Sequence, residues 1–450
     1  MTNDLTKGTP AKLIFMFAIP FLIGNLFQQF YNMVDTIIVG RTLGVEALAA
    51  VGATGTLTWF AMGTIQGFTT GLSAVAAQYF GANDETGIRK CFAMSILVSF
   101  LFTAVMTAVM VIFAYPILEI LNTPADIIKD SYSYIIWIYT GLAATNLTNL
   151  MSNMIRALGD SKTPLVFLVV GCLVNIVLDF VLIIYGKMGT GAAGLATAIA
   201  QLVSGILCVI YILRKLPQLH VSKQDFRIDA GIVKRLLKIG MPMAFLNMVL
   251  AVGGVVIQWV NNGLGTIYVA TYSSANKIEQ FLTQPILSFG SAVAVYAAQN
   301  YGACKFERIK KGVNQTIGMT FVISVLGTFV MFFFGKTFMM FVAGGENEEI
   351  IINGYYYLLI NSAMTVFLIP LVIYKSVLQA IGSAVLPIFS GFVEVFARAG
   401  ASILLTDAFG FIGLCFANPA AWFSGLIPIA YDYYRFLKKI FNHQLTNPQA

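Results

Sequence analysis

The stretch AAQYFGA at residues 76–82 returns as AAQNYGA at residues 297–303, with five of the seven positions identical. The same spacing of 221 residues pairs Leu43-Gly44 with Leu264-Gly265. Self-similarity at a fixed spacing indicates a repeated structural unit. The chain is therefore predicted to contain two halves of one design.

A second block supports the repeat. IRALGDSKTPL at 155–165 resembles LQAIGSAVLPI at 378–388, and this alignment pairs Gly159 with Gly382. The matches occur in the same order in both halves, which chance does not readily produce.

The composition identifies the environment of these halves. Of 450 residues, 58% are hydrophobic and 10% charged, whereas soluble domains carry about 25% charged residues. Runs of about twenty weakly charged residues, each able to cross a bilayer, recur twelve times between residues 13 and 434. One run, at 47–80, is longer than a single crossing needs.

Six spans per half give both halves the same orientation in the membrane. We therefore predict an all-α polytopic membrane protein of twelve transmembrane helices, in two parallel six-helix repeats related by a pseudo-two-fold axis along the membrane normal. The expected domains are an N-terminal lobe at 1–213, a polar cytoplasmic connector at 214–235 and a C-terminal lobe at 236–450.

The positive charge is a topology signal. The formal net charge is +7, and most of the 27 Lys and Arg residues, Lys375 among them, fall on the side of the membrane that holds both termini and the connector. The other side holds only Arg41, Lys129, Lys187 and Lys336. By the positive-inside rule, both termini are expected in the cytoplasm. Because the positive charge is explained by topology, we expect no nucleic-acid partner.

Several kinds of chemistry lack sequence support. The five cysteines are widely spaced, and the two histidines, His220 and His443, have no clustered partners, so no disulfide framework or zinc site is predicted. No hydrolase or phosphate-binding motif is complete. We expect that the protein has no cofactor and that it is not an enzyme.

Asp35 is an aspartate deep in an apolar span, FQQFYNMVDTIIVG at 27–40. Asp179 lies in a second span, with Asn175 four residues earlier on the same helix face, and Thr197 lies in a third. A charge at the bilayer centre costs about 2.5–3.5 kcal/mol, so such residues usually have a function. The alternative is that these groups only hold helices together.

Two carboxylates in one low-dielectric pocket cannot both stay ionised without a cation, because burial and like charge both oppose it. The pair either takes up a proton or holds a metal ion. Together with Asn175 and Thr197 they offer an all-oxygen site that would suit Na⁺. Further polar residues lie in the same half; they are Gln28, Tyr31, Asn146, Asn149 and Asn153.

Four charged residues fall inside spans of the second half: Lys277, Glu279, Glu394 and Arg398. Glu394 precedes Arg398 by four residues, the favourable order for an intrahelical ion pair. These residues are predicted to be internally neutralised, with a structural or gating role rather than substrate contact.

Taken together, these features resemble the multidrug and toxic compound extrusion (MATE) transporters, above all the DinF-like branch. The motifs are Q-x-x-Y-x-x-x-D followed by V-G-R-x-L-G in the first span, A-A-Q-Y-x-G-A closing the second and I-R-A-L-G-D-S-K-T-P after the fourth. The resemblance implies a cation site formed by Asp35, Asn175, Asp179 and Thr197, with the five further polar residues of the first half lining the substrate cavity.

The resemblance also implies a function. We expect a monomeric antiporter in a prokaryotic cytoplasmic membrane that expels organic cations and other amphipathic drugs in exchange for inward H⁺ or Na⁺. The alternatives are a lipid-linked oligosaccharide flippase of the same superfamily and, from other classes, an ion channel or a membrane-embedded enzyme.

The topology generates a first prediction. In a variant without native cysteines, Ser222→Cys in the connector should not react with a membrane-impermeant thiol reagent added outside intact cells, because the connector is cytoplasmic. Lys187→Cys, on the opposite side, should react. Ready external labelling of the Ser222→Cys variant would refute the twelve-span topology.

Overall fold

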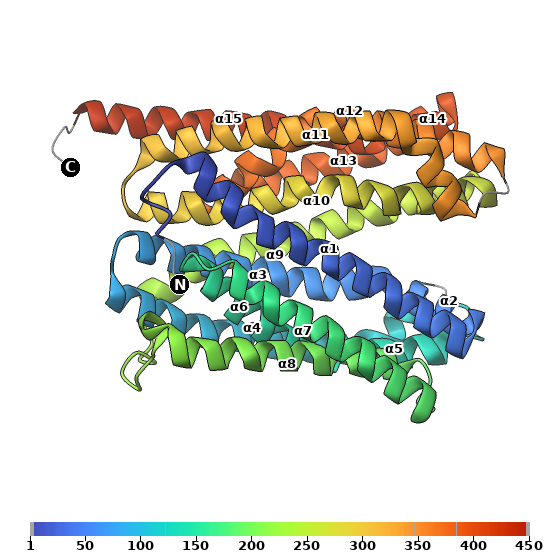
Figure 1. Ribbon diagram of the computed structural model, residues 1–450, viewed down its shortest axis with the longest axis horizontal. Coiled ribbons are helices and arrows are strands. Elements are labelled where there is room, and N and C mark those ends of the chain that lie inside the picture. Colours follow the sequence, from blue (N-terminus) through green and yellow to red (C-terminus); the bar gives the residue numbers. More distant parts are fainter. Residues whose placement is uncertain (1–3, 122, 345–346, 384, 447–450) are drawn as a thin grey trace. The chain divides into compact units, whose positions relative to one another are not determined.

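The computed structural model describes residues 4–121, 123–344, 347–383 and 385–446, and these residues form helices without any strand. The first half holds α1 (Pro10–Leu43), α2 (Val45–Ala53), α3 (Gly55–Gly81), α4 (Glu85–Ile120), α5 (Ile128–Thr140), α6 (Leu142–Ala157), α7 (Lys162–Asp179), the π-helix η1 (Phe180–Tyr185) and α8 (Gly191–Lys215). The second half, after the 3-10 helix η2 (Pro217–Leu219), holds α9 (Ala230–Gly263), α10 (Thr266–Gly302), α11 (Phe306–Ala343), α12 (Glu348–Ile381), α13 (Val385–Phe409), α14 (Phe411–Cys415) and α15 (Ala417–Thr446) (Figure 1).

These helices confirm the all-helical membrane fold. Within the described residues, ten helical segments are long and apolar enough to cross a membrane, and the bent pair α2–α3 makes an eleventh crossing. The expected span at 47–80 is this pair, with a bend of 40°. The expected span at 128–151 is also broken, because α5 ends and α6 begins at Gly141. Neither α5, of 13 residues, nor α6, of 16, is as long as a typical crossing on its own.

The backbone carries the repeat that the sequence predicts. Gly44 and Gly265, 221 residues apart, both have positive φ angles, of 92° and 105°. Asn83 and Cys304 share the same spacing and also lie in the left-handed region, at φ 56° and 57°, which non-glycine residues seldom adopt. Both follow an A-A-Q motif, so the two halves turn in the same unusual way at the same place.

The pattern of packed helices also repeats. In the first half α3 packs on α4 and α6, and α8 packs on α6 and α7. In the second half α10 packs on α11 and α12, and α15 packs on α12 and α13. Each half therefore builds the same arrangement from its own helices.

Packing divides the chain into two units, whose boundaries differ from those of the two sequence halves. Unit 1 consists mainly of Ile19–Asn247, and unit 2 of Thr6–Ala18 with Met248–Ala450. The helices α1 and α9 therefore each contribute to both units. The sequence-based division at the 214–235 connector stays a prediction. The predicted cytoplasmic ends, 1–3 and 447–450, lie outside the described residues.

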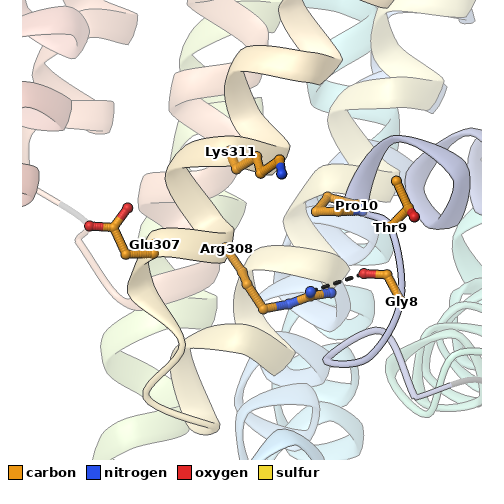
Figure 2. Close-up of a pocket in the computed structure, with 6 residues that line it drawn as sticks. All are labelled: Gly8, Thr9, Pro10, Glu307, Arg308 and Lys311. Atoms are coloured by element: carbon orange, nitrogen blue, oxygen red, sulfur yellow. Dashed lines mark hydrogen bonds between the residues drawn. The ribbon is translucent and has the colours of Figure 1, made fainter.

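Side chains from α11 and the preceding turn bind the start of α1 within unit 2. The Nη1 atom of Arg308 donates to the carbonyl oxygen of Gly8 at 2.9 Å, beside a pocket that Lys311 also lines (Figure 2). Lys305 Nζ donates to the carbonyl oxygen of Thr6 at 3.0 Å. These bonds satisfy carbonyl groups ahead of the helix that would otherwise need water.

The connector is held by local hydrogen bonds. The backbone N and the Oγ atom of Ser222 each donate to Asp225 Oδ2 at 2.7 Å. These bonds stabilise the carboxylate and hold the pKa of Asp225 below its ordinary value.

Two glycines of α3 allow close packing against α9. A Cβ atom on Gly71 would lie 2.6 Å from the Cα of Gly240 in α9, and one on Gly67 would lie 2.7 Å from the carbonyl oxygen of Met243. Small residues allow the two helix backbones to approach where lipid supplies little driving force for association.

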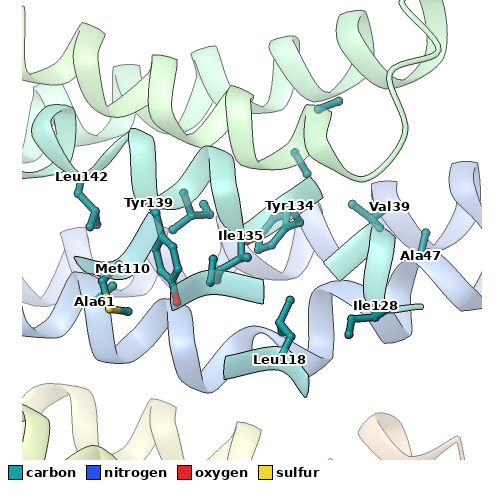
Figure 3. Close-up of a cluster of buried hydrophobic side chains, with 14 of the residues drawn as sticks. Val39, Ala47, Ala61, Met110, Leu118, Ile128, Tyr134, Ile135, Tyr139 and Leu142 are labelled. Atoms are coloured by element: carbon teal, nitrogen blue, oxygen red, sulfur yellow. The ribbon is translucent and has the colours of Figure 1, made fainter. Parts of the chain in front are cut away.

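A buried cluster joins the helices of unit 1; we call it the unit 1 core (Figure 3). Tyr134, Ile135 and Tyr139 of α5 lie at its centre, among Val39 of α1 and Leu118 of α4. Its remaining members are Ile38, Ala47, Ala61, Ile65, Met106, Met110, Ala114, Ile128, Ile138, Leu142, Ile183, Ala192 and Ala193. The core fixes the positions of α1, η1 and α8 relative to one another.

In unit 2, a buried ion pair links α12 to α13. Lys375 Nζ binds Glu394 Oε1, with only 11% and 5% of the two side chains exposed. Ser390 Oγ also donates to Glu394 Oε1, at 3.1 Å. The prediction that Glu394 pairs with Arg398 is therefore wrong. Spacing within α13 could not reveal that α12 brings Lys375 to the same carboxylate.

This pair generates a stability prediction. Glu394→Gln should lower the free energy of unfolding by about 3 kcal/mol, because it leaves the Lys375 ammonium buried without its counter-ion. Thermal unfolding of the purified protein in detergent measures the loss.

Adding Lys375→Met to Glu394→Gln should recover most of that loss. Adding Arg398→Met instead should recover none of it, and it serves as the matched control. Recovery with Arg398→Met but not with Lys375→Met would contradict the assignment of the pair.

Candidate cation site in unit 1

Two aspartates meet inside unit 1. Asp35 of α1 and Asp179 at the end of α7 lie close enough for their carboxyl groups to interact. Asp179 is fully buried and Asp35 partly so. A carboxyl group donates to a second one only when it is protonated. The geometry therefore fits a pair that shares one proton.

One oxygen of each carboxyl group has no partner. The Oδ1 atoms of Asp35 and Asp179 are both buried without a hydrogen bond. Buried polar atoms are normally satisfied, so an orphaned pair indicates a missing proton, ion or water. Within the described residues, no Lys, Arg or His lies within 4.0 Å of either carboxylate.

Asn175 and Thr197 complete the site. With its amide oriented to suit its neighbours, Asn175 donates to Asp179 Oδ2 at 3.0 Å and accepts from the backbone N of Thr197 at 3.1 Å. The side chains of Asn175 and Asp179 meet because they lie one helical turn apart in α7. The amide thereby ties α7 to α8.

Tyr31 belongs to this site. Thr197 Oγ1 donates to the carbonyl oxygen of Ala193 at 3.0 Å, which leaves its lone pairs to accept. The OH of Tyr31 lies 3.3 Å away and is placed to donate to it. The family resemblance implies a substrate-cavity role for Tyr31, whereas here its OH contacts Thr197, one of the proposed cation ligands.

The helix changes its winding directly after Asp179. Residues Phe180–Tyr185 form the π-helix η1, a conformation that is rare and often found at functional sites. Ile183 of η1 packs into the unit 1 core. The buried carboxylate of Asp179 thus sits at the junction of two helical windings.

Tyr134 was missed by the sequence reasoning. It lies in the unit 1 core and interacts electrostatically with both Asp35 and Asp179. Its segment, SYSYIIWIYT, shows three tyrosines with nothing to distinguish this one. The close approach of α8 to α5, where a Cβ on Gly194 would lie 2.6 Å from the Tyr134 carbonyl oxygen, positions it.

The other polar residues of this half do not form one cluster. Gln28 is exposed and Asn149 partly buried. Asn146 is buried and donates to Ser99 Oγ at 3.3 Å. Asn153 donates to the hydroxyl oxygens of Thr69 and Thr70, both at 3.3 Å. Asn146 and Asn153 therefore connect α6 to α4 and α3, as the helix-packing alternative expects.

The charged residues predicted to lie inside spans of the second half differ in burial and in hydrogen-bond partners. Glu279 is buried and accepts from the OH of Tyr357. Arg398 is half-buried, with its Nη1 beside Gly253 and its Nε without a partner. Lys277 is exposed. A separation of two residues turns it away from the face of α10 that buries Glu279.

The described residues contain no group of three or more His, Cys, Asp and Glu side chains placed to hold a metal. The acid pair with an amide and a hydroxyl can still bind a hard monovalent cation through oxygen, or exchange a proton.

Comparison with known proteins gives consistent results. The chain is 28% identical to the probable multidrug resistance protein YoeA of Bacillus subtilis, over 72% of this chain and 71% of that protein. It is 22% identical to an FAD transporter of Shewanella oneidensis, over 74% and 75%. A solved multidrug resistance MATE family transporter, in an outward-facing conformation, superposes with a TM-score of 0.91 at 20% identity, over 98% and 99% of the two chains.

The sequence model of the MatE family matches residues 20–181 and again 242–404. One match falls in each half, as the repeat requires. The chain is a multi-pass membrane protein and a member of the MatE family of transporters.

Proposed function

We propose that this protein is a secondary active antiporter that expels organic cations and other amphipathic drugs in exchange for inward H⁺ or Na⁺. The observation that carries the proposal is the Asp35–Asp179 pair, buried with unpartnered oxygens and no basic neighbour among the described residues.

Antiport follows if the coupling ion and a cationic substrate compete to neutralise this acid pair. Two buried carboxyl groups are stable with one proton or one bound cation, and releasing that ion leaves a charge that must be compensated. A cationic substrate supplies the compensation. Ion and drug thus favour different states of unit 1, which is the differential binding that alternating access requires.

The relatives support transport and leave the cargo open. One is named for multidrug resistance and another for FAD, so the family name alone does not select a substrate. A lipid-linked oligosaccharide flippase is the second candidate, and the acidic character of the unit 1 site argues against such an anionic cargo. An ion channel or a membrane-embedded enzyme finds no supporting relative among these transporters.

The remaining features of the proposal follow from the sequence. We propose a monomer in a prokaryotic cytoplasmic membrane, as the family resemblance implies. Both termini are proposed to lie in the cytoplasm, because Lys and Arg gather on that side. The assignment to the DinF-like branch rests on the motifs of the first half.

Asp35→Asn tests the coupling role. The change keeps the size of the side chain and removes the exchangeable charge, so the protein should insert and accumulate normally while ethidium efflux from cells falls to background. Asp126→Asn, an exposed acid in the α4–α5 loop, is the matched control and should retain full efflux. Full resistance of cells carrying Asp35→Asn at equal expression would make Asp35 a packing residue.

Thr197→Val distinguishes the two coupling ions. Valine keeps the shape but removes the hydroxyl, which can ligate Na⁺ and is not required for proton carriage. We favour H⁺, with Na⁺ able to compete, so proton-driven efflux in proteoliposomes should stay within about twofold of wild type. Thr271→Val, which loses the same kind of bond to the carbonyl oxygen four residues earlier, controls for stability.

The opposite outcome is equally clear. Wild-type efflux that persists without a pH gradient, follows an imposed Na⁺ gradient and disappears in Thr197→Val would establish Na⁺ as the coupling ion.

A further inference from the structure

A pocket lies within unit 2 where α11 meets the start of α1 (Figure 2). Arg308 and Lys311 line it from α11, and the backbone that begins α1 lines it from the other side, at Gly8, Thr9 and Pro10. Its volume of about 450 Å³ is large beside the roughly 30 Å³ of a water molecule. We call it the basic pocket.

The two basic side chains point into this pocket. Arg308 and Lys311 both extend toward the start of α1, whereas Glu307, which also lines the pocket, points away from them (Figure 2). Lys311 is exposed, and within the described residues no carboxylate oxygen lies within 4.0 Å of its Nζ. A guanidinium and an ammonium one helical turn apart suit the oxygens of a phosphate group.

The walls of the basic pocket are held in place on both sides of Lys311. One turn before it, Arg308 donates from Nε to Asn300 Oδ1 at 3.0 Å and from Nη1 to the carbonyl oxygen of Gly8 at 2.9 Å. One turn after it, Gln315 Oε1 accepts from the backbone N of Ala11 at 2.9 Å. The pocket is therefore preformed, which lowers the entropic cost of binding a ligand.

An exposed face of α11 continues from this pocket along the membrane span. Lys311, Gly318, Val325 and Phe329 are all exposed, at spacings of seven, seven and four. Such spacings place residues on one face of a helix. A Cβ atom on Gly318 would meet nothing within 4 Å, so this face has an open track between the ammonium group and the apolar side chains.

The track leads to a groove between α11 and α12, with a volume of about 480 Å³; we call it the α11–α12 groove. Its exposed apolar side chains are Phe321, Val325, Phe329 and Phe332 of α11 and Val366 of α12.

The polar groups of the α11–α12 groove bind one another. The hydroxyls of Ser324 and Thr365 share a hydrogen bond, and Thr328 Oγ1 donates to the carbonyl oxygen of Ser362 at 3.1 Å. Because these groups are satisfied within the protein, an apolar ligand in the groove leaves none of them unpaired. The groove suits an acyl chain.

The distance between the two sites fits one lipid molecule. Phe321, at the near end of the groove, follows Lys311 by ten residues, which at 1.5 Å per residue is about 15 Å along the helix. This is half of the roughly 30 Å hydrocarbon core, the depth that the acyl chains of one leaflet reach. A free phosphate would occupy only the basic pocket, and an uncharged lipid only the groove.

We propose that the basic pocket and the α11–α12 groove together bind one anionic phospholipid. Its phosphate lies against Arg308 and Lys311, as in other basic pockets at membrane surfaces, and an acyl chain follows the exposed face of α11. This lipid site lies in unit 2 and does not depend on the proposed efflux function.

Lipid binding to the purified, delipidated protein in detergent tests the phosphate contact. In a titration with dioleoyl phosphatidylglycerol followed by native mass spectrometry, Lys311→Met should weaken binding about tenfold, as expected for the loss of one ion pair. Lys311→Arg should retain most of the affinity, because the charge remains. Lys234→Met, which removes an exposed lysine of α9, is the matched control and should bind like wild type.

Gly318→Phe tests the path of the acyl chain. The phenyl ring fills the open track, so binding of dioleoyl phosphatidylglycerol should weaken, while the weaker binding of dihexanoyl phosphatidylglycerol, whose chains are too short to reach the groove, should stay unchanged. Unchanged affinity of Lys311→Met for the dioleoyl lipid, or equally tight binding of dioleoyl phosphatidylcholine to wild type, would overturn the proposal. If inorganic phosphate or the dihexanoyl lipid binds as tightly as the dioleoyl lipid, the pocket binds a free phosphate group and the lipid site is refuted.

Discussion

The buried contact between Asp35 and Asp179 is the constraint on which unit 1 depends. Two carboxyl groups in a membrane interior repel each other when both are ionised, and their free oxygens have no basic neighbour in the described structure. The unit 1 core holds α1, η1 and α8 against this repulsion. The pair therefore stays together only with a proton or cation, and that requirement is what an antiporter can exploit.

The two units share a fold but differ in their use of charge. In unit 1 the Asp35–Asp179 pair has no basic partner among the described residues, whereas in unit 2 Glu394 binds Lys375 and Glu279 binds the OH of Tyr357. Lys277 of unit 2 is exposed, and the Nε atom of Arg398 has no hydrogen-bond partner. The two halves therefore share a fold while their buried acids have different partners.

Much of this was readable from the sequence, because the signals were local or repeated. The A-A-Q motifs located the equivalent turns at Asn83 and Cys304, and the spacing of Asn175 and Asp179 placed both on one face of α7. What failed depended on contacts between helices. The Lys375–Glu394 pair joins α12 to α13, and Tyr134 reaches the acid pair through the packing of α5 on α8. The exposure of Lys277 required knowing which face of α10 is buried.

The central claim is that the Asp35–Asp179 pair holds a proton that a cationic substrate displaces. Potentiometry of the purified protein in weakly buffered detergent solution measures this directly, as protons released when ethidium binds. The account predicts release by wild type and none by Asp179→Asn, whose binding of ethidium is followed separately by fluorescence. Equal release by the variant, or binding to wild type without any release, would contradict it.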